Sequence, residues 1–355
     1  MAKNKKTTIQ DLANYANVSI GTIDRVLHNR GKVSPAKRKK VEEAIEKLDF
    51  NPNLLARTLA LGSQFTVCSL FPEATSSQSY WTLPRIGVDQ GVEVYKDFGM
   101  ELHPYEYSLF NESSFVKSAD AILGKNPSGV ILAPLFEKES QEFISKLEER
   151  DIPYVFIDAN IKNKKSLSYI GPDLRGSGYI AGKLLNSLLD PSDDILIVNM
   201  VKGFENSAHT ALVENGFRDY FKEHGPRKKR SINSITIPTT VETEVNRELT
   251  TYYIKNPGTR GVFVTNSRAH LISRHHALHE LDIKVVGFDI VPGNVSELKN
   301  GNIDYIISQR PVFQGVTAVK ALFDYFVYKK SPSAIQFVPL DIIIKENVDY
   351  YINFQ

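Results

Sequence analysis

The 355-residue sequence predicts an α/β protein in two parts, with three short helices in residues 1–63 and a doubly wound α/β body in residues 64–355. Helical periodicity in the first part, and apolar runs alternating with amphipathic stretches in the second, predict these structures. Charge also separates the parts, because residues 1–63 hold 12 Lys/Arg against 6 Asp/Glu and the remainder holds 31 against 35. A small basic unit therefore precedes a mildly acidic body.

The composition also limits compartment and chemistry. No run of eighteen apolar residues occurs, and the start "MAKNKKTTIQ" lacks the apolar stretch of a signal peptide, so we expect a cytoplasmic protein with no membrane contact. Glycine-rich nucleotide loops, nucleophile elbows, HExxH and cysteine pairs are missing, so we expect neither an enzyme nor a bound cofactor or metal. The single cysteine, Cys68 in "FTVCSLF", is expected to be a buried strand residue.

Helix signals divide the basic unit into three short helices. Thr8 precedes an apolar-periodic run and Asp11 follows three residues later, which is the pattern of a capping box. Ser19 is placed to cap a second helix, and Pro35 marks the first turn of a third. This is the geometry of a helix-turn-helix unit whose second helix enters the major groove of DNA, although a generic three-helix bundle fits the same pattern.

The body alternates apolar runs with amphipathic stretches. Seven runs are predicted strands: "FTVCSLF", "GVILAPL", "IPYVFIDA", "DILIVNM", "GVFVTNS", "IKVVGFDI" and "IDYIISQ". Such alternation indicates parallel sheets covered on both faces. A polar, lysine-rich break at residues 160–172 predicts two subdomains, one formed by about 64–160 and 291–330 and the other by about 161–290 and 331–355. Residues that follow the strands are candidates for a site in the cleft between them, because ligands of open α/β sheets bind at the carboxyl ends of strands.

Residues 8–62 carry a long motif, "TIQDLANYANVSIGTIDRVLHNRGKVSPAKRKKVEEAIEKLDFNPNLLARTLALG". This segment resembles the head of the lactose repressor (LacI/GalR) family of bacterial transcription regulators, whose first two helices read A-x-x-A-x-V-S-x-x-T-V-S-R-V-L-N. The matching positions are Ala13, Ala16, Val18, Ser19, Thr22, Arg25, Val26 and Leu27. Two positions depart from the pattern, because Asp24 replaces the usual serine and His28 the usual asparagine.

The resemblance implies which residues of the second helix meet DNA. The base-facing positions would be Ile20, Gly21 and Arg25, and the phosphate-facing positions would be Ser19, Thr22 and His28. Gly21 has no side chain with which to read a base. Arg25 suits bidentate bonding to guanine O6 and N7, a contact worth about 1–3 kcal/mol of discrimination.

Asp24 is a carboxylate in an otherwise basic neighbourhood. The basic residues that follow supply phosphate attraction that one acid reduces without cancelling: Lys32, Lys37, Arg38, Lys39 and Lys40. Asp24 could accept a hydrogen bond from a cytosine N4 amine, orient Arg25, or face a phosphate and weaken binding. The sequence leaves these three roles open.

The segment "NPNLLARTLALG" resembles the hinge helix of the same family, which orders on operator binding and inserts a leucine into the minor groove. The resemblance implies that Asn51 or Asn53 caps this helix, that Ala56 packs against the hinge of a partner chain, and that Leu59 is the inserted residue. Packing of Leu59 on its own body is the alternative.

Several segments of the body carry motifs of the periplasmic sugar-binding-protein fold: "VVGFDIVP", "IPYVFIDAN", "VTNSRA", "SQRPVFQG" and, with paired aromatics, "SYWTLPRIGVDQG". The body resembles that fold, which is also the effector domain of the lactose repressor family. The resemblance implies effector contacts from Tyr80, Trp81, Asp158, Asn266, Asp289 and Gln309. Carboxylates and amides bond sugar hydroxyls, and an aromatic face suits a ring's C–H surface. Taken singly, each residue could instead cap a helix or fill the core.

Two features of the body fit this pattern less directly. The ribose-binding branch of the fold has an arginine where this chain has Val213, so either another residue, such as Arg175, Asn206 or His209, supplies that contact or the ligand differs. Arg175 could equally be a surface cation. In "SRHHALHE", His275 and His279 share a helix face as a candidate metal pair, but solvated histidines fit better because no acid flanks them.

The sequence thus predicts a sequence-specific DNA-binding transcription regulator, a homodimeric repressor whose operator affinity changes when a monosaccharide or derivative binds in the cleft. Its partners would be double-stranded operator DNA and this effector. Coupling through the hinge helices would amount to about 1–3 kcal/mol. Corepression or activation within the same family is an alternative, and a sugar-binding receptor without a regulatory role is another.

Overall fold

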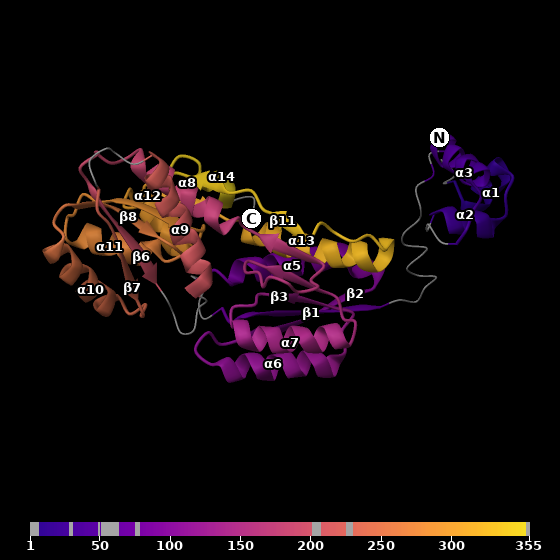
Figure 1. The fold of residues 1–355 in the computed structure, drawn as a ribbon, viewed down its shortest axis with the longest axis horizontal. Coiled ribbons are helices and arrows are strands. Elements are labelled where there is room, and N and C mark those ends of the chain that lie inside the picture. The colour runs from indigo at the N-terminus through magenta and orange to yellow at the C-terminus, as the bar shows by residue number, and fades with distance from the viewer. Residues whose placement is uncertain are drawn as a thin grey trace. The chain divides into compact units, whose positions relative to one another are not determined.

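The computed structural model describes residues 7–27, 31–48, 50, 64–74, 79–200, 207–224 and 230–352, with the backbone alone for residues 207 and 208. The chain divides into two compact units, Met1–Ser63 and Gln64–Gln355. The predicted fold class, a helix-turn-helix unit followed by a doubly wound α/β body with two sheets, is confirmed (Figure 1).

The first unit contains helices α1 (Ile9–Ala16), α2 (Ile20–Leu27) and α3 (Pro35–Lys47). The predicted capping box is present, since the Asp11 N–H donates to the Thr8 hydroxyl at 3.2 Å and the Thr8 N–H donates to the Asp11 carboxylate at 2.8 Å. Asn17 ends α1 in the left-handed conformation, and the Thr22 N–H donates to Ser19 Oγ at 3.3 Å at the start of α2. The three helices enclose a small core of Leu12, Ala13, Ala16, Ile23, Val26, Val41, Ala44 and Phe50.

The amino-terminal lobe of the body, residues 64–171 and 311–337, contains a parallel sheet in the order β11-β5-β4-β3-β1-β2. Its strands are β1 (Phe65–Pro72), β2 (Met100–Tyr107), β3 (Gly129–Leu132), β4 (Tyr154–Ile157), β5 (Ser168–Gly171) and β11 (Ile335–Phe337). Helices α6 (Glu112–Lys125) and α7 (Glu137–Glu149) cover one face, and α5 (Thr82–Tyr95) and α13 (Pro311–Phe323) cover the other (Figure 1). A 3-10 turn, Lys96–Phe98, follows α5, and a π-helical turn, Asp324–Tyr328, follows α13.

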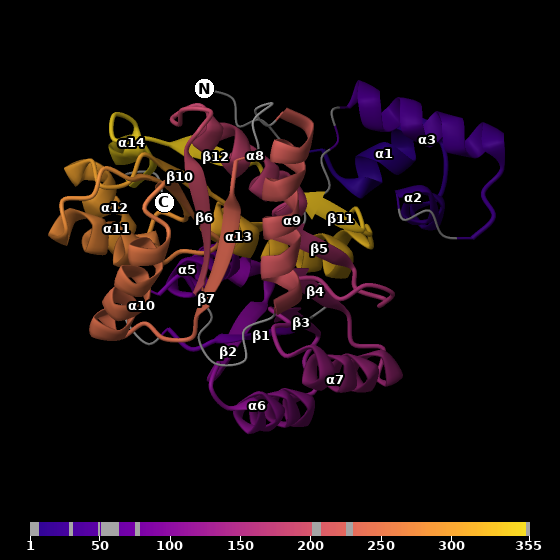
Figure 2. The ribbon, with the colours of Figure 1, turned by 60° about the vertical axis from the view of Figure 1, so that its left-hand side comes forward.

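The carboxy-terminal lobe, residues 174–308 and 341–352, repeats this topology in the order β12-β10-β9-β8-β6-β7. Its strands are β6 (Asp194–Met200), β7 (Ile232–Ile237), β8 (Thr259–Val264), β9 (Lys284–Phe288), β10 (Tyr305–Ser308) and the antiparallel edge strand β12 (Asp341–Ile343). Helices α8 (Leu174–Asn186) and α9 (Ser207–His224) lie on one face (Figure 2). The other face carries α10 (Glu242–Lys255), α11 (Ala269–Leu278) and α12 (Pro292–Asn300), and α14 (Val348–Ile352) ends the described chain.

Both lobes bring one helix pair into close contact through glycine. A Cβ atom at Gly87 of α5 would overlap the carbonyl oxygen of Val312 on α13. In the carboxy-terminal lobe, a Cβ at Gly178 of α8 would overlap the carbonyl oxygen of Val213 on α9. The two helix backbones therefore approach as closely as they do only because these positions lack a side chain.

Strand pairing corrects the predicted subdomain boundaries. β5 pairs with β4 in the amino-terminal sheet, so the polar break before it is a loop between neighbouring strands and not a passage between lobes. β10 pairs with β9 in the carboxy-terminal sheet, and β11 pairs with β5, so both were assigned to the wrong subdomain. The chain passes between lobes at 172–173, 309–310 and 338–340. Polar composition marks a surface connection, but pairing decides which sheet the next strand joins.

The histidines of α11 also differ from the prediction. His275 and His276 are buried, and only His279 of the three is exposed. His275 Nε2 lies 3.1 Å from the Thr250 hydroxyl, and His276 Nε2 lies 2.7 Å from the Tyr253 hydroxyl. Burial lowers the pKa of His275 to about 4 and that of His276 to about 3, so both are neutral parts of the packing between α10 and α11.

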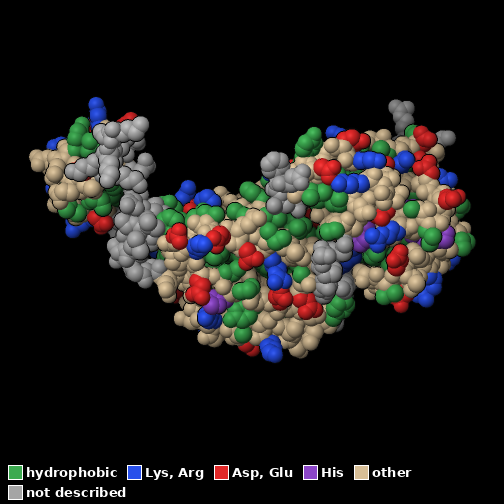
Figure 3. Space-filling model, turned by 180° about the vertical axis from the view of Figure 1, so that it is seen from behind, with side chains coloured by type: hydrophobic (Ala, Val, Ile, Leu, Met, Phe, Trp, Pro, Cys, Tyr) green, Lys and Arg blue, Asp and Glu red, His purple; other side chains and the backbone are tan. Residues whose placement is uncertain are grey.

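Cys68 and the charged side chains of the body lie where the composition predicts. Cys68 is fully buried on β1, as predicted, and burial raises its thiol pKa to about 11. Basic and acidic side chains are interspersed on the face of the body seen in Figure 3. Within the described ranges, no helix is both long and apolar enough to cross a membrane, and no group of three or more His, Cys, Asp or Glu is placed to hold a metal ion.

Candidate functional site

A pocket lies where the carboxyl ends of the strands of both lobes meet. Its volume is about 290 Å³, and each lobe contributes residues that directly follow strands. Glu73 follows β1 and Asp158 follows β4 in one lobe, and Asp289 and Gln309 follow β9 and β10 in the other. This is the position at which open α/β sheets bind ligands, because loops at the strand ends face a shared crevice.

Six of the seven residues assigned to effector binding from the sequence line this pocket: Tyr80, Trp81, Asp158, Asn266, Asp289 and Gln309. They come from segments up to 229 positions apart, Tyr80 to Gln309, and the strand ends bring them together. The seventh, Arg175, does not line it.

The wall from the amino-terminal lobe centres on Asp158. The Tyr80 hydroxyl donates to Asp158 Oδ1 at 2.8 Å, and burial is the main cause that raises the Tyr80 pKa well above its ordinary value. Asp158 has a φ of 63°, and its carbonyl accepts from the Tyr169 hydroxyl at 3.1 Å. Trp81 is only 7% exposed, with its ring centroid 6.3 Å from that of Phe71, so it forms part of the wall beneath the opening.

The wall from the carboxy-terminal lobe has Asp289 at the equivalent strand end. Asp289 also has a left-handed φ, 68°, and Gln309 Nε2 donates to both of its carboxylate oxygens at 3.2 Å. Burial, and then the negative charge of Asp158, raise the pKa of Asp289 to about 8, and the Gln309 bonds oppose this only in part. Asp289 therefore holds a proton at neutral pH.

Gln314 connects the two walls. This α13 side chain is fully buried, and its amide donates to the Gln309 carbonyl at 2.9 Å while its oxygen accepts from the Asp158 N–H at 3.1 Å. One side chain thus fixes both the passage after β10 and the strand end of β4. A change in the angle between the lobes would therefore alter the lengths or angles of these two hydrogen bonds.

Two further polar groups are anchored on one carbonyl. The Met200 carbonyl accepts from Asn266 Nδ2 at 2.6 Å and from an Arg268 guanidinium N–H at 2.7 Å. Asn266 Oδ1 is buried with no hydrogen-bond partner among the described residues. A ligand donor would satisfy that oxygen, and an unsatisfied buried acceptor is costly.

Two histidines complete this side of the pocket. His270 Nδ1 lies 2.9 Å from Asn294 Oδ1, and burial is the main cause that lowers the His270 pKa. A neutral ring that donates from Nδ1 leaves Nε2 as an acceptor. His209 Nε2 is buried and has no partner within the described part of the chain.

The sequence prediction missed Arg268 and three hydroxyl-bearing residues, Thr210, Thr240 and Ser267, all of which line the pocket. The signal was available for Ser267 and Arg268, because they follow Asn266 after β8. Thr210 could not be found in this way, since it lies near the start of α9.

Arg175 was wrongly assigned to the pocket. Its side chain is 66% exposed and donates from Nε to Asp219 on α9 at 2.7 Å. Val213 is 1% exposed and packs into the hydrophobic core of the carboxy-terminal lobe, and its side chain does not line the pocket. His209, one of the three residues considered in its place, does line the pocket, and Asn206 lies outside the described residues.

The second helix of the first unit presents an exposed polar face. Ile23 and Val26 are buried, which turns Ile20, Asp24 and Arg25 outward. Ser19 and Gly21 are also exposed and Thr22 is half-buried. Among the described residues, and apart from the backbone of α2 itself, a Cβ placed at Gly21 would approach Ser19 Oγ at 4.0 Å. His28 and Leu59, and with Leu59 the whole hinge segment 51–63, lie outside the described residues.

The fold and the pocket define a protein with a helix-turn-helix unit and a two-lobed, small-ligand-binding body. Residues 69–330 match the family model described as periplasmic binding protein domain, and residues 8–53 match that of bacterial regulatory proteins, lacI family. The chain belongs to the periplasmic-binding-protein family, whose model covers most of its length, and its amino-terminal unit is a domain of the lacI family.

Among its relatives, a Bacillus subtilis (strain 168) protein described as a probable HTH-type transcriptional repressor, ExuR, is 27% identical over 203 residues, 56% of each chain. Catabolite control protein A of Priestia megaterium is 30% identical over 183 residues, 52% of each chain. The chain spans about half the length of the curated relatives it matches. A crystal structure from Bacteroides fragilis, described as a LacI transcriptional regulator, superposes with a TM-score of 0.75 at 28% identity, over 81% of this chain and 100% of that one.

Proposed function

We propose that the protein is a DNA-binding transcription regulator, a repressor, whose affinity for its operator is set by a small sugar or sugar derivative in the pocket. The observation that supports this most directly is that one chain joins a helix-turn-helix unit to a pocket of strand-end carboxylates and amides. The helix-turn-helix unit can bind DNA, and the pocket can form hydrogen bonds with the hydroxyls of a polyol.

DNA recognition is proposed for the exposed face of α2. Arg25 would bond a guanine edge and Ile20 would contact a base, with Ser19 and Thr22 on phosphates. Gly21 leaves open space that a base pair or the DNA backbone could fill. We also propose that His28 contacts a phosphate and that Leu59 enters the minor groove. For Asp24 the proposal keeps three roles: accepting from a cytosine, orienting Arg25, or weakening binding beside a phosphate.

Two copies of the chain are proposed to bind together, because helix-turn-helix dimers place their second helices in successive major grooves. Effector binding would change the angle between the lobes and with it the spacing of the two hinge segments. Gln314 would respond to such a change, since it bonds the passage after β10 and the strand end of β4. The effector could release the protein from its operator, act as a corepressor or support activation. These three outcomes differ only in the direction in which effector binding changes operator affinity.

The test begins with selection of binding sites from a random duplex pool by the full-length protein. We expect a site with two-fold symmetry, and fluorescence anisotropy on that duplex should show that Arg25→Ala weakens binding by about 1–3 kcal/mol and relaxes the preference at one base pair per half-site. Arg175→Ala, an arginine of the body surface, is the control and should bind as the natural chain does.

Effector control is then measured on the same duplex. A sugar that raises the melting temperature of the protein should shift its operator affinity, in either direction, by about fivefold to 150-fold. A protein that bound sugars but selected no DNA sequence would be a sugar-binding receptor and would refute the proposal.

A further inference from the structure

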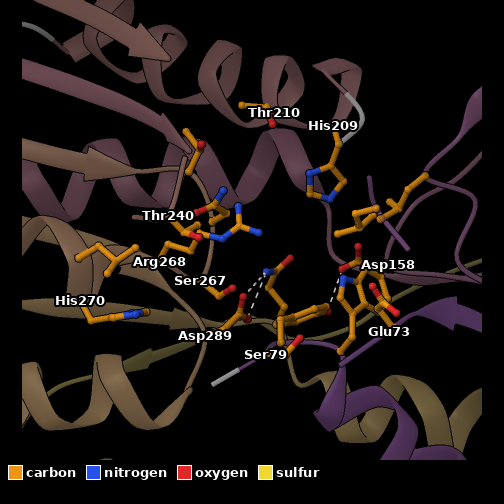
Figure 4. A pocket seen from close by; sticks show the side chains of 18 of the residues that line it. Glu73, Ser79, Asp158, His209, Thr210, Thr240, Ser267, Arg268, His270 and Asp289 are labelled. Carbon is orange, nitrogen blue, oxygen red and sulfur yellow. Dashed lines mark hydrogen bonds between the residues drawn. The ribbon is translucent and has the colours of Figure 1, made fainter. Parts of the chain in front are cut away.

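The two walls of the pocket differ in charge and donor chemistry. The amino-terminal lobe contributes the carboxylates of Glu73 and Asp158. The carboxy-terminal lobe contributes Arg268 together with hydroxyls, including those of Thr210 and Thr240, and one carboxyl, that of Asp289. Figure 4 shows these groups apart, with Arg268 close to Thr240 and Ser267, and with Asp158 and Glu73 on the opposite side. A ligand that spans the pocket therefore meets an acidic end and a basic end.

Arg268 is held in place at the basic end. One guanidinium N–H donates to the Met200 carbonyl at 2.7 Å, and the same carbonyl accepts from Asn266 at 2.6 Å. A carbonyl contact orients a guanidinium without removing its positive charge. The planar fork of an arginine matches a carboxylate or a phosphate better than it matches a single hydroxyl.

Backbone dipoles add to this charge. Thr210 lies in the first turn of the 18-residue helix α9, and Arg268 immediately precedes the 10-residue helix α11. Both helix starts line the pocket on the same side, and helix N-termini favour anions because their first N–H groups point outward. His209 Nε2, also in the first turn of α9, is buried and has no partner among the described residues, so a bound acceptor would satisfy it when Nε2 carries the ring hydrogen.

The acidic end suits hydroxyls. Asp158 and Asp289 lie at equivalent strand ends, with the Tyr80 hydroxyl and the Gln309 amide as their respective partners. Because burial and Asp158 raise the pKa of Asp289, this end carries less negative charge at neutral pH than two ionised carboxylates would. This end of the pocket therefore repels an anion bound near Arg268 less strongly.

We infer that the effector is an anionic sugar, with a carboxylate or phosphate bound at Arg268, Thr210 and the starts of α9 and α11, and with its ring hydroxyls at Asp158, Asp289 and Gln309. The inference rests on the proposed sugar-sensing function and adds the chemical class of the ligand. Carboxylate and phosphate share the chemistry that Arg268 recognises, so the experiment separates them.

The experiment uses the full chain and matched triplets of glucose, galactose and mannose, each as the neutral aldose, the uronate and the 6-phosphate. Thermal shift identifies binders, and calorimetry gives their dissociation constants. At least one uronate or one 6-phosphate should bind at least tenfold more tightly than its neutral parent. Arg268→Met should weaken that anion by roughly tenfold to a hundredfold, the range for losing a hydrogen bond to a charged group, and Arg268→Lys should restore part of the loss.

Arg175→Met is the matched control, because it removes an arginine of the same lobe outside the pocket and should leave every dissociation constant unchanged. Equal or tighter binding of the neutral parents would overturn the inference while leaving sugar sensing intact. The same holds if Arg268→Met weakened neutral and anionic members of a triplet equally. If none of the nine compounds shifted the melting temperature, both the inference and the proposed sugar sensing would be lost.

Discussion

The two lobes of the body have the same strand order and place an aspartate at the same strand end, yet these aspartates have different surroundings. Asp158 accepts from a tyrosine hydroxyl, and Asp289 accepts from a glutamine amide. Both have left-handed φ angles, 63° and 68°. The backbone of a repeated fold therefore sets where the carboxylates lie, and the neighbouring side chains set their hydrogen bonds and protonation.

The helix pairs of the lobes make a second comparison. Gly87 in one lobe and Gly178 in the other each admit a facing carbonyl, whereas a Cβ placed at Gly124 on α6 would have no neighbour within 4 Å. The first two glycines are required by packing and the third is not. Replacing glycine by alanine should therefore be destabilising at Gly87 and Gly178 but not at Gly124.

The largest expected effect tests this packing equivalence. Gly87→Ala and Gly178→Ala should each lower the free energy of unfolding by about 3 kcal/mol, because the added methyl forces the helices apart. Gly124→Ala is the control and should be neutral or stabilising by up to about 1 kcal/mol. Denaturant unfolding followed by the single tryptophan, Trp81, reports on the body alone. Tolerance of alanine at either buried position would show that the close approach is not required there.

The second prediction separates the aspartates by pH. The pKa of Asp289 is raised from 3.8 to about 8, so the native state keeps a proton that the unfolded chain releases, and stability should fall as pH rises between these values. The Asp289 contribution should fall with a slope of about 1.4 kcal/mol per pH unit near pH 6.5 and about half of that at pH 8, a loss of roughly 1.6 kcal/mol across this range. Asp289→Asn should flatten this slope.

Other titrating groups also affect the pH dependence of stability in this range. The buried histidines His270, His275 and His276 have lowered pKa values, so the stability they add is lost as pH falls through about 6.5, and at that end of the window their effect opposes the Asp289 slope. The difference in the free energy of unfolding between the natural protein and Asp289→Asn removes this shared contribution. Asp158→Asn removes a charge that raises the Asp289 pKa, so the slope should end at a lower pH. The same pH dependence for the natural protein and Asp289→Asn between pH 6.5 and 8 would contradict a protonated Asp289.

The third prediction concerns the partner of Asp158. Tyr80→Phe keeps the ring but removes the hydroxyl that donates to Asp158, and should destabilise the body by about 1.5 kcal/mol, since the carboxylate is nearly buried. Circular dichroism is the suitable measurement, because the change lies beside Trp81. An unchanged stability would mean that water replaces the hydroxyl and that the two aspartates are less different than their contacts indicate.

The smallest effect is expected at Arg175. Its bond to Asp219 is largely solvent-exposed, so Arg175→Met should change the free energy of unfolding by less than about 1 kcal/mol. The comparison with Arg268→Met isolates the pocket arginine from the surface one. A large loss at Arg175 would indicate that the α8–α9 surface depends on this pair.

Sequence patterns anticipated the features that depend on local chemistry. The capping box of Thr8 and Asp11 and the proline start of α3 follow from neighbouring residues alone. Asp158, Asn266, Asp289 and Gln309 were found because a parallel strand ends at a predictable place, and Tyr80 and Trp81 were found through the resemblance of residues 79–91 to the sugar-binding fold. Arg268 was missed although it lies two residues beyond Asn266, and Arg175 was chosen although it faces solvent.

The sequence by itself determined the two-part organisation, the strand and helix types, the burial of Cys68 and the strand ends that supply polar groups. These are properties of periodicity and of residues close in the chain. Only the tertiary structure decided which sheet β5, β10 and β11 join, that His275 and His276 are buried, and that Arg268 lies opposite Asp158. Those outcomes depend on hydrogen-bond pairing and packing between segments far apart in sequence, which no local pattern encodes.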